Sequence, residues 1–165
     1  MYKKISCLAV LSSLVFSPGM AAEAPAFIKI PRLTLETVQK IAQAALTECR
    51  KGENQVSVTI VDRSGHTVIV LRDTLAPEVT LELSRQKAYT AMSFNAATST
   101  LENRFTQPFS VGKIQGLLFY AGGVPIEAGG NIVGGIGVSG APAGTEDEKC
   151  ASAGVLAAQF DLETP

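Results

Sequence analysis

The side chains that could do chemistry in this sequence are few, and their spacing joins none of them into a catalytic group. His66 is the one histidine of the 165-residue chain, which excludes a metal centre built from several histidines. It follows a turn at the start of a predicted strand, where a solvent-facing side chain is favoured over a metal ligand. Because His66 has no evident partner, neither a Ser-His-Asp nor a Cys-His nucleophile is indicated, so the residues favour binding over catalysis.

The helix predicted after Pro77 carries other candidate groups. Arg85 and Tyr89 are neighbours four residues apart on this helix, whereas Lys87 emerges beside apolar positions. Lys87 therefore either binds a ligand carboxylate or lays its stem along the surface with its charge in water, and both interpretations stay open. Tyr89 and Tyr120 could ligate iron or stack on a flat ligand, although packing is the commoner role of a tyrosine at an apolar face.

A glycine-rich stretch from Gly122 to Gly140 is predicted to form the floor of a site. It has eight glycines in nineteen residues, and a turn signal at 127–131 separates two apolar runs, which is typical of an antiparallel hairpin. Glycines let a flat ligand or another backbone approach closely, so we expect backbone donors here rather than reactive side chains. Residues 135–140 match the dinucleotide fingerprint GxGxxG, but Pro142 and Gly144 precede the next helix and its first turn is acidic, so nucleotide binding is not expected.

Alternating helix and strand signals predict the elements that hold these groups. Thr34 is the expected N-cap of an amphipathic helix, and capping-box patterns predict helix starts at Ser99 and Thr145. In chain order we expect a helix at 34–50, strands at 56–61 and 67–71, a helix at 77–94, a short helix at 99–105, a loop at 106–116, the glycine hairpin and a final helix from 145. Antiparallel strands separated by helices that must cover a sheet make this an α+β layered domain.

The first residues have the pattern of a signal peptide. Lys3 and Lys4 precede an apolar run too short to span a bilayer, and small residues follow, with cleavage expected after Ala21. Residues 1–21 are thus a predicted signal peptide, residues 22–33 an extended leader, and residues 34–162 a single domain. The protein is predicted to be exported, either periplasmic or secreted.

Charge and cysteine content limit the partners of the mature protein. Removing Lys3 and Lys4 leaves 12 basic residues against 15 acidic ones, a net charge of −3, with no basic block. Nucleic acid and anionic membranes are therefore not expected as partners. Cys49 and Cys150 remain, and an even pair in an exported protein permits a disulfide, although two buried free thiols are the alternative.

Ordered blocks along the whole predicted domain carry a family resemblance. They are VTIVDRSG at 58–65, residues 85–91, GGVPI at 122–126, GGIGVSGAP at 134–142 and residues 147–154. Over roughly residues 34–160 the chain resembles the GlcG/HbpS-like haem-binding family. The resemblance implies a profilin-like fold, a central antiparallel sheet covered by helices, with the first and last helices on one face. That placement would bring the helices of Cys49 and Cys150 together, which favours the disulfide.

The resemblance also implies a ligand and a place for it. Family members are linked to haem or other tetrapyrrole binding, to haem degradation, and to accessory roles in glycolate and diol metabolism, and they commonly assemble as homo-oligomers. Haem is therefore the expected cofactor, with its propionates near Lys87 or Arg104 and with His66 as a weak candidate iron ligand. Related sequences often have histidine after the proline where this chain has Glu78, so one potential iron ligand of the family is absent. The site residues that the resemblance implies are Lys87, Arg104, Phe105, Phe109, Gly122, Gly123, Val124, Pro125 and Ser139.

Three functions are compatible with these features. The first is an exported protein that binds a small molecule, haem or a related tetrapyrrole, and assembles as a homo-oligomer. Neither nucleic acid nor, after signal cleavage, a membrane is expected as its partner. The second is an enzyme or sensor for a small hydroxy acid or carbonyl compound, in which Lys87 binds the carboxylate and hairpin amides stabilise a developing oxyanion. The third is an accessory subunit whose glycine surface contacts a partner protein.

Overall fold

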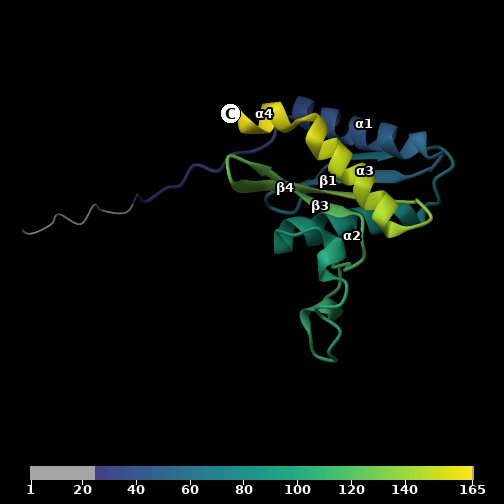
Figure 1. Cartoon of the computed structure of the whole chain (residues 1–165). Coiled ribbons are helices and arrows are strands. Elements are labelled where there is room, and N and C mark those ends of the chain that lie inside the picture. The colour runs from purple at the N-terminus through teal and green to yellow at the C-terminus, as the bar shows by residue number, and fades with distance from the viewer. Residues whose placement is uncertain (1–24, 165) are drawn as a thin grey trace, which may run out of the picture. The chain divides into compact units, whose positions relative to one another are not determined.

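The computed structural model describes residues 25–164 of the chain (Figure 1). The predicted signal peptide and its cleavage site lie outside the described residues. The chain divides into two units, residues 1–30 and residues 31–165, and the second unit holds the helices and strands described below. Residues 25–33 form neither helix nor strand. None of the helices within residues 25–164 combines the length and the apolar character that crossing a bilayer requires.

One antiparallel sheet of four strands forms the middle layer. Its strands are β1 (Ser57–Asp62), β2 (Thr67–Arg72), β3 (Gly123–Ala128) and β4 (Asn131–Ser139), in the order β2-β1-β4-β3. In this register Gly137 of β4 lies between Thr59 of β1 and Gly123 of β3. The glycine-rich stretch is therefore the hairpin that the sequence predicts, with β4 inside the sheet and β3 at its edge.

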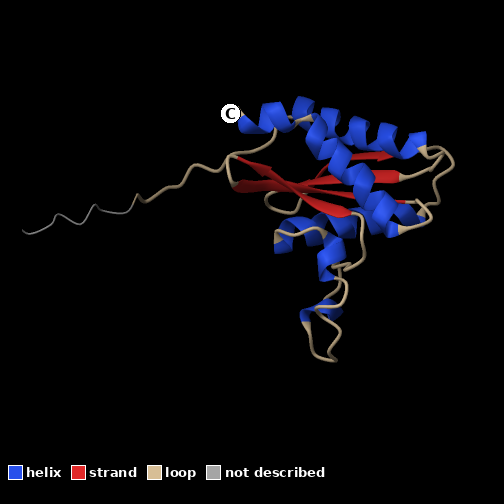
Figure 2. Ribbon diagram, in the orientation of Figure 1, coloured by secondary structure: helices blue, strands red, loops and turns tan. Residues whose placement is uncertain are grey.

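Helices cover both faces of this sheet (Figure 2). The helices α1 (Leu35–Lys51), α3 (Gly144–Ala157) and α4 (Gln159–Glu163) lie over one face, and α2 (Val79–Phe94) lies over the other. The predicted α+β layered architecture is confirmed, including the first and last helices on one face. The N-terminus of α1 is also confirmed, because Thr34 Oγ1 accepts a hydrogen bond from the Thr37 amide at 3.3 Å.

The two faces of the sheet differ in chemistry, because successive residues of a strand point to opposite sides. The face under α1 and α3 is apolar, and its central residues are buried. The face under α2 carries hydroxyl groups and glycines, and Thr59 Oγ1 of β1 pairs with Ser84 Oγ of α2 at 2.8 Å. The strand residues that belong to the apolar core are Val58, Ile60, Ile126, Val133, Ile136 and Val138.

The glycines of β4 let α2 lie directly on the sheet, which corrects their predicted role as the floor of a site. A Cβ atom at Gly137 would overlap the carbonyl oxygen of Ser84, and one at Gly135 would overlap that of Ala88. Real Cβ atoms do not approach a backbone oxygen so closely, so only glycine at these positions lets the backbones of helix and sheet come this near. The group that lies against these glycines is therefore α2 of the same chain and not a ligand.

The helix starts predicted at Ser99 and Thr145 each lie within one residue of an observed helix start. The predicted capping-box hydrogen bonds are wrong, because the acidic side chains bond to other segments. Residues Thr98–Leu101 form a short 3-10 helix, η1, and Ser99 donates from its amide and its hydroxyl to the carboxylate of Glu148. The helix α3 begins at Gly144 without a side-chain cap. A second 3-10 turn, η2 (Val111–Lys113), lies in the loop that follows η1. Tertiary contacts thus replaced the local hydrogen bonds on which the pattern depends.

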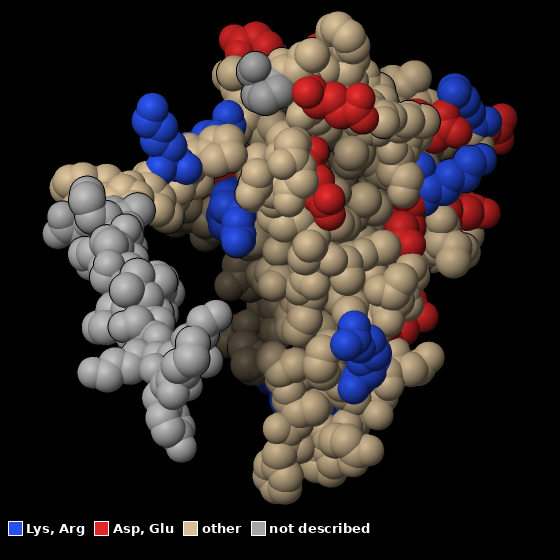
Figure 3. Space-filling view, turned by 60° about the vertical axis from the view of Figure 1, so that its left-hand side comes forward, with Lys and Arg blue, Asp and Glu red and all other residues tan. Residues whose placement is uncertain are grey.

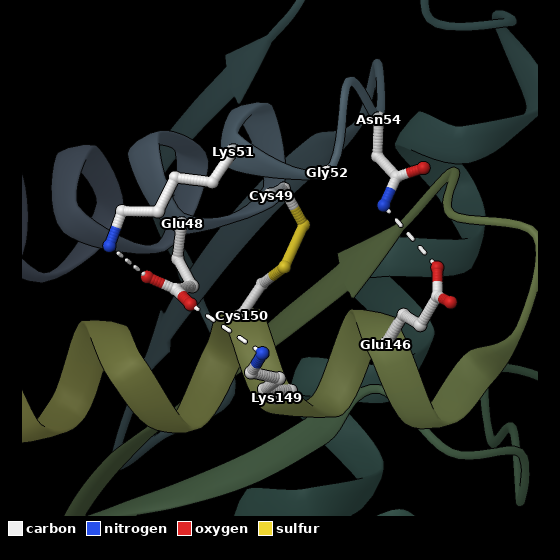
Figure 4. A pocket seen from close by; sticks show the side chains of 8 residues that line it. All are labelled: Glu48, Cys49, Lys51, Gly52, Asn54, Glu146, Lys149 and Cys150. Atoms are coloured by element: carbon white, nitrogen blue, oxygen red, sulfur yellow. Dashed lines mark hydrogen bonds and ion pairs between the residues drawn. A yellow bond between two sulfur atoms is a disulfide. The ribbon is translucent and has the colours of Figure 1, made fainter.

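A disulfide joins Cys49 of α1 to Cys150 of α3, with 5.4 Å between their Cα atoms. The sequence left a disulfide and free thiols open, and the family resemblance favoured the disulfide. Figure 4 shows the hollow beside it, where the carboxylate of Glu48 lies between the ammonium groups of Lys51 and Lys149, at 2.6 Å and 3.9 Å. The disulfide and the Lys149–Glu48 ion pair therefore join α1 to α3, whereas the Lys51–Glu48 pair lies within α1.

Candidate functional site

The segment 102–121, between η1 and β3, forms a projecting loop on the α2 side of the sheet (Figure 1). Its two ends meet at a neck, where the amide of Ala121 donates to Glu102 Oε1 at 2.8 Å. The amide of Leu118 donates to Thr90 Oγ1 of α2, also at 2.8 Å. The loop is thus fastened to the body at its base and beside α2.

Two adjoining hollows lie between this loop and the body. The first, here the sheet hollow, has a volume of about 530 Å³ and is lined among others by Leu83, Lys87, Ser139 and Asp147. The second, here the loop hollow, has a volume of about 320 Å³ and is lined among others by Phe105, Lys113 and Phe119. Both are also lined by Glu102, Leu118 and Tyr120, which form their common wall.

Lys87 lies at the base of the sheet hollow as one half of a buried ion pair. Its Nζ donates to Asp147 Oδ2 at 2.9 Å and to the Val138 carbonyl at 3.0 Å, and the two charged side chains are 6% and 4% exposed. The amide of Ala141 donates to the other carboxylate oxygen, at 3.0 Å. Burial raises the pKa of Asp147, and the hydrogen bond and charge of Lys87 oppose that rise.

This ion pair changes how Lys87 can be interpreted. A surface lysine with its charge in water is excluded by its burial. Its ammonium group has an internal acid as its partner, so a ligand carboxylate would compete with Asp147 for it. Lys87 and Ser139 are the two predicted site residues that the structure brings together in the sheet hollow.

The hairpin amides that the enzyme hypothesis requires already have acceptors. The amide of Gly122 donates to Glu148 Oε2 at 3.2 Å, and that of Gly123 donates to Thr98 Oγ1 at 2.8 Å. A Cβ at Gly122 would lie 2.6 Å from Lys87 Nζ, so this glycine admits the lysine side chain. The expectation that these amides stabilise an oxyanion is therefore wrong for these two donors.

Val124 and Pro125 lie away from Lys87. They line a third hollow, of about 380 Å³, formed by β3 together with Leu156 of α3 and Leu162 of α4. The predicted stretch Gly122 to Pro125 is therefore divided, with two buried glycines facing the lysine and two apolar residues facing the last helices.

Aromatic rings support the loop hollow. Phe94 of α2, Phe105 and Phe119 form a cluster with ring centroids 4.9 to 5.3 Å apart. The guanidinium of Arg104 lies 5.7 Å from the centre of the Phe105 ring. Phe109, in the same loop, is fully exposed and lines neither hollow.

Tyr120 is the side chain whose role sequence reasoning underestimated. Packing was favoured for it, but it is 66% exposed and belongs to the common wall of the two hollows. His66 is 82% exposed at the β1–β2 turn, as the sequence favoured. Met92, a residue of another type that can ligate haem iron, is buried beside Val61. Within residues 25–164 no group of three histidine, cysteine or acidic residues could hold a metal ion.

Three other lining residues were also missed. Glu102 was assigned to a capping box, Asp147 to the acidic first turn of the final helix, and Lys113 to a loop without a role. A signal for Lys113 was present, because residues 103–121 contain two basic residues and no acidic one. The position of Asp147 opposite Lys87, sixty residues away along the chain, had no local signal.

Comparisons with known proteins agree with this fold. A family model described as haem degrading protein HbpS-like matches residues 33–156. The crystal structure of a double mutant of Streptomyces reticuli HbpS is 41% identical, has a TM-score of 0.76, and is matched over 85% of this chain and 96% of that chain. A PduOC complex with haem is 26% identical, with a TM-score of 0.69, over 77% of this chain and 95% of that chain. A Citrobacter freundii relative, an uncharacterised 15.0 kDa protein in the dhaT-dhaS intergenic region, is 27% identical over 117 residues, 68% of this chain and 82% of the relative.

Proposed function

The chain belongs to the HbpS-like haem-degrading protein family, and on that basis we propose that it is an exported protein that binds haem or a related tetrapyrrole. The observation that carries this proposal is the pair of adjoining hollows beside the loop. Their walls combine aliphatic and aromatic side chains with basic groups and one exposed phenol. Two relatives support the choice of ligand, since one is named HbpS and the other was crystallised with haem.

The lining residues fit the chemistry of a tetrapyrrole. Its flat apolar ring requires apolar and aromatic surfaces, which Leu118, Phe105 and Phe119 supply. Bound haem would supply an iron centre, whose protein ligands are commonly His, Cys, Met or Tyr. Among the described residues of these types, Tyr120 is the one that lines the two hollows. Neither lining includes His66, Tyr89, Met92, Cys49 or Cys150. Tyr120 is therefore the proposed iron ligand.

A haem titration of the mature protein followed by absorbance tests the proposal. We expect a saturable shift of the Soret band with a dissociation constant of about 1 μM or lower, roughly −8 kcal/mol. Leu118→Glu, which places a charge in the common wall, should weaken binding, whereas Leu156→Glu in the third hollow should not. The absence of a saturable shift would reject the tetrapyrrole proposal.

Export remains part of the proposal, with residues 1–21 as the signal peptide. The Cys49–Cys150 disulfide supports it, because disulfides persist mainly in oxidising compartments outside the cytosol. Expression of the full chain, cell fractionation and N-terminal sequencing test this point. A mature N-terminus at Ala22 in the exported fraction is expected, and an unprocessed chain in the cytosol would contradict it.

Assembly as a homo-oligomer is likewise proposed. Tyr120 is 66% exposed, and Val68 and Val70 of the edge strand β2 are 39% and 43% exposed, so apolar surface is available for a second copy. Light scattering after size-exclusion chromatography should give a mass that is a multiple of one chain. A monomer at all protein concentrations would reject this proposal.

A further inference from the structure

The loop carries a local positive charge on an acidic protein. Residues 103–121 contain Arg104 and Lys113 and no acidic residue, whereas the chain as a whole has a net charge of −1. The loop lies at the lower end of the molecule in Figure 1 and stays at that end in Figure 3, which is turned about the vertical axis. The surface there is largely uncharged, and the charged side chains that Figure 3 shows on it are basic. A surface of this kind suits a ligand that is mostly apolar and carries a few anionic groups.

Hydrogen bonds within the loop hold Lys113 and Phe105 in place. Ser110 Oγ donates to the Phe105 carbonyl at 2.6 Å, and the amide of Lys113 donates to the Ser110 carbonyl at 3.1 Å. A Cβ at Gly112 would lie 2.5 Å from the Phe105 carbonyl oxygen, so the two sides of the loop are in close contact. The loop is therefore a built structure that places a lysine and an aromatic ring in the wall of one hollow.

Both cations of the loop lack an acidic partner among the described residues. Lys113 lines the loop hollow, and Arg104 lies over the ring of Phe105, which lines the same hollow. Neither forms an ion pair within residues 25–164, whereas Lys87 in the sheet hollow is paired with Asp147. Glu102 is the acid in the shared wall, and its carboxylate accepts the Ala121 amide at the neck.

We infer that Arg104 and Lys113 bind the carboxylates of the ligand, and that Lys87 does not. This inference rests on the proposed function and specifies how the ligand is oriented in its site. The ring lies against the aromatic wall of Phe105 and Phe119, with its anionic edge toward the two cations of the loop. Guanidinium and ammonium groups form charge-assisted hydrogen bonds with carboxylates, and an arginine beside an aromatic ring keeps its donors free for them.

The experiment compares two ligands and two pairs of substitutions. Haem and its dimethyl ester, which keeps the ring but lacks both charges, are titrated into the wild type and into Arg104→Ala/Lys113→Ala. The matched control is Arg72→Ala/Lys149→Ala, which removes the same two charge types from β2 and from the disulfide face. We expect the loop variant to bind haem roughly tenfold more weakly, because each exposed charge interaction is modest. Its affinity for the dimethyl ester should be unchanged, and the control should match the wild type with both ligands.

Each other outcome overturns the inference in a distinct way. If the loop variant binds haem as tightly as the wild type does, the carboxylates bind elsewhere. If it loses haem and ester equally, the loop acts by packing and not by charge. If the wild type binds neither ligand, the tetrapyrrole proposal fails and the inference falls with it, a result that the first two outcomes cannot produce.

Discussion

At the scale of single residues, the Lys87–Asp147 pair is the main constraint on the site. Two charges that are almost fully buried stabilise a protein little as a pair, but removing one leaves the other without compensation. The pair also has a structural role, because it links α2 to α3, and Asp147 accepts a hydrogen bond from the Ala141 amide. These contacts explain why a lysine stands beside apolar positions of α2 without being a surface residue.

Replacing Lys87 with Met should destabilise the protein by about 3–5 kcal/mol near neutral pH, because Asp147 loses its partner. Burial already raises the folded-state pKa of Asp147 above its ordinary value of 3.8, and without Lys87 it should rise further. A folded state that binds more protons than the unfolded state loses stability as the pH rises from 3.8 through the raised pKa. The deficit of the variant should therefore be largest above that window and shrink below it.

Urea unfolding of the wild type and of Lys87→Met across this pH range measures the deficit. The double variant Lys87→Met/Asp147→Leu, which removes both charges, should regain part of the lost stability. A deficit that does not depend on pH would indicate lost packing and not an uncompensated charge.

A second residue-scale prediction concerns the iron ligand. Tyr120→Phe keeps the ring in the shared wall and removes the phenol oxygen, so the Soret and charge-transfer bands of the haem complex should change. His66→Ala should leave the spectrum as it is, since His66 is 82% exposed on the β1–β2 turn. Absorbance spectra of the two variants decide the point, and the opposite result would assign the iron to His66.

At the scale of elements, the contact between α2 and the hairpin determines where the site can form. The glycines of β4 admit the helix backbone, and Gly122 admits the Lys87 side chain. Because α2 covers the glycines of β4, no ligand can bind over them. The sheet hollow instead lies at the end of the hairpin, between α2 and the loop. The loop, the neck at Glu102 and the first turns of α3 then form the walls.

Gly137→Ala should lower the free energy of unfolding by about 2–4 kcal/mol, because its Cβ overlaps the Ser84 carbonyl and overpacking moves backbone. Gly52→Ala is the matched control, since its Cβ would meet a flexible Asn54 side chain at 3.2 Å, and a change below about 1 kcal/mol is expected. Chemical denaturation of both variants provides the comparison. Equal stabilities would show that α2 can shift without cost.

At the scale of the whole molecule, the disulfide joins the first and last long helices across 101 residues of sequence. In the chain-entropy model, closing a loop of this length stabilises the folded state by about 4–5 kcal/mol. Neither cysteine lines the two hollows, so the disulfide should influence stability more than ligand binding.

Replacing Cys49 and Cys150 by Ser should therefore lower the free energy of unfolding by about 3–5 kcal/mol. The affinity for haem at a temperature where the variant stays folded should change less than about twofold, because no lining residue of either hollow is altered. Denaturation and titration of the same preparation test both statements. A large loss of affinity in a folded variant would mean that the disulfide face and the site are coupled.

The sequence by itself determined the elements and the family. Hydrophobic periodicity placed the first helix and both hairpins, and Thr34 marked the start of α1, because these signals depend on near neighbours in the chain. Blocks such as GGVPI and GGIGVSGAP carried the family resemblance, which a match over residues 33–156 confirms. The α+β architecture follows from the same element order.

Only the tertiary structure decided what the polar groups do. Glu102 and Glu148 have the spacing of capping-box acids, and Asp147 lies in the acidic first turn of a helix, yet all three bond to segments 19 to 60 residues away. Likewise, glycine permits a close approach without specifying what approaches, and the approaching group is α2. Hydrogen bonds between distant segments depend on how the layers pack, and no local pattern records that packing, so the site could be located only in the folded protein.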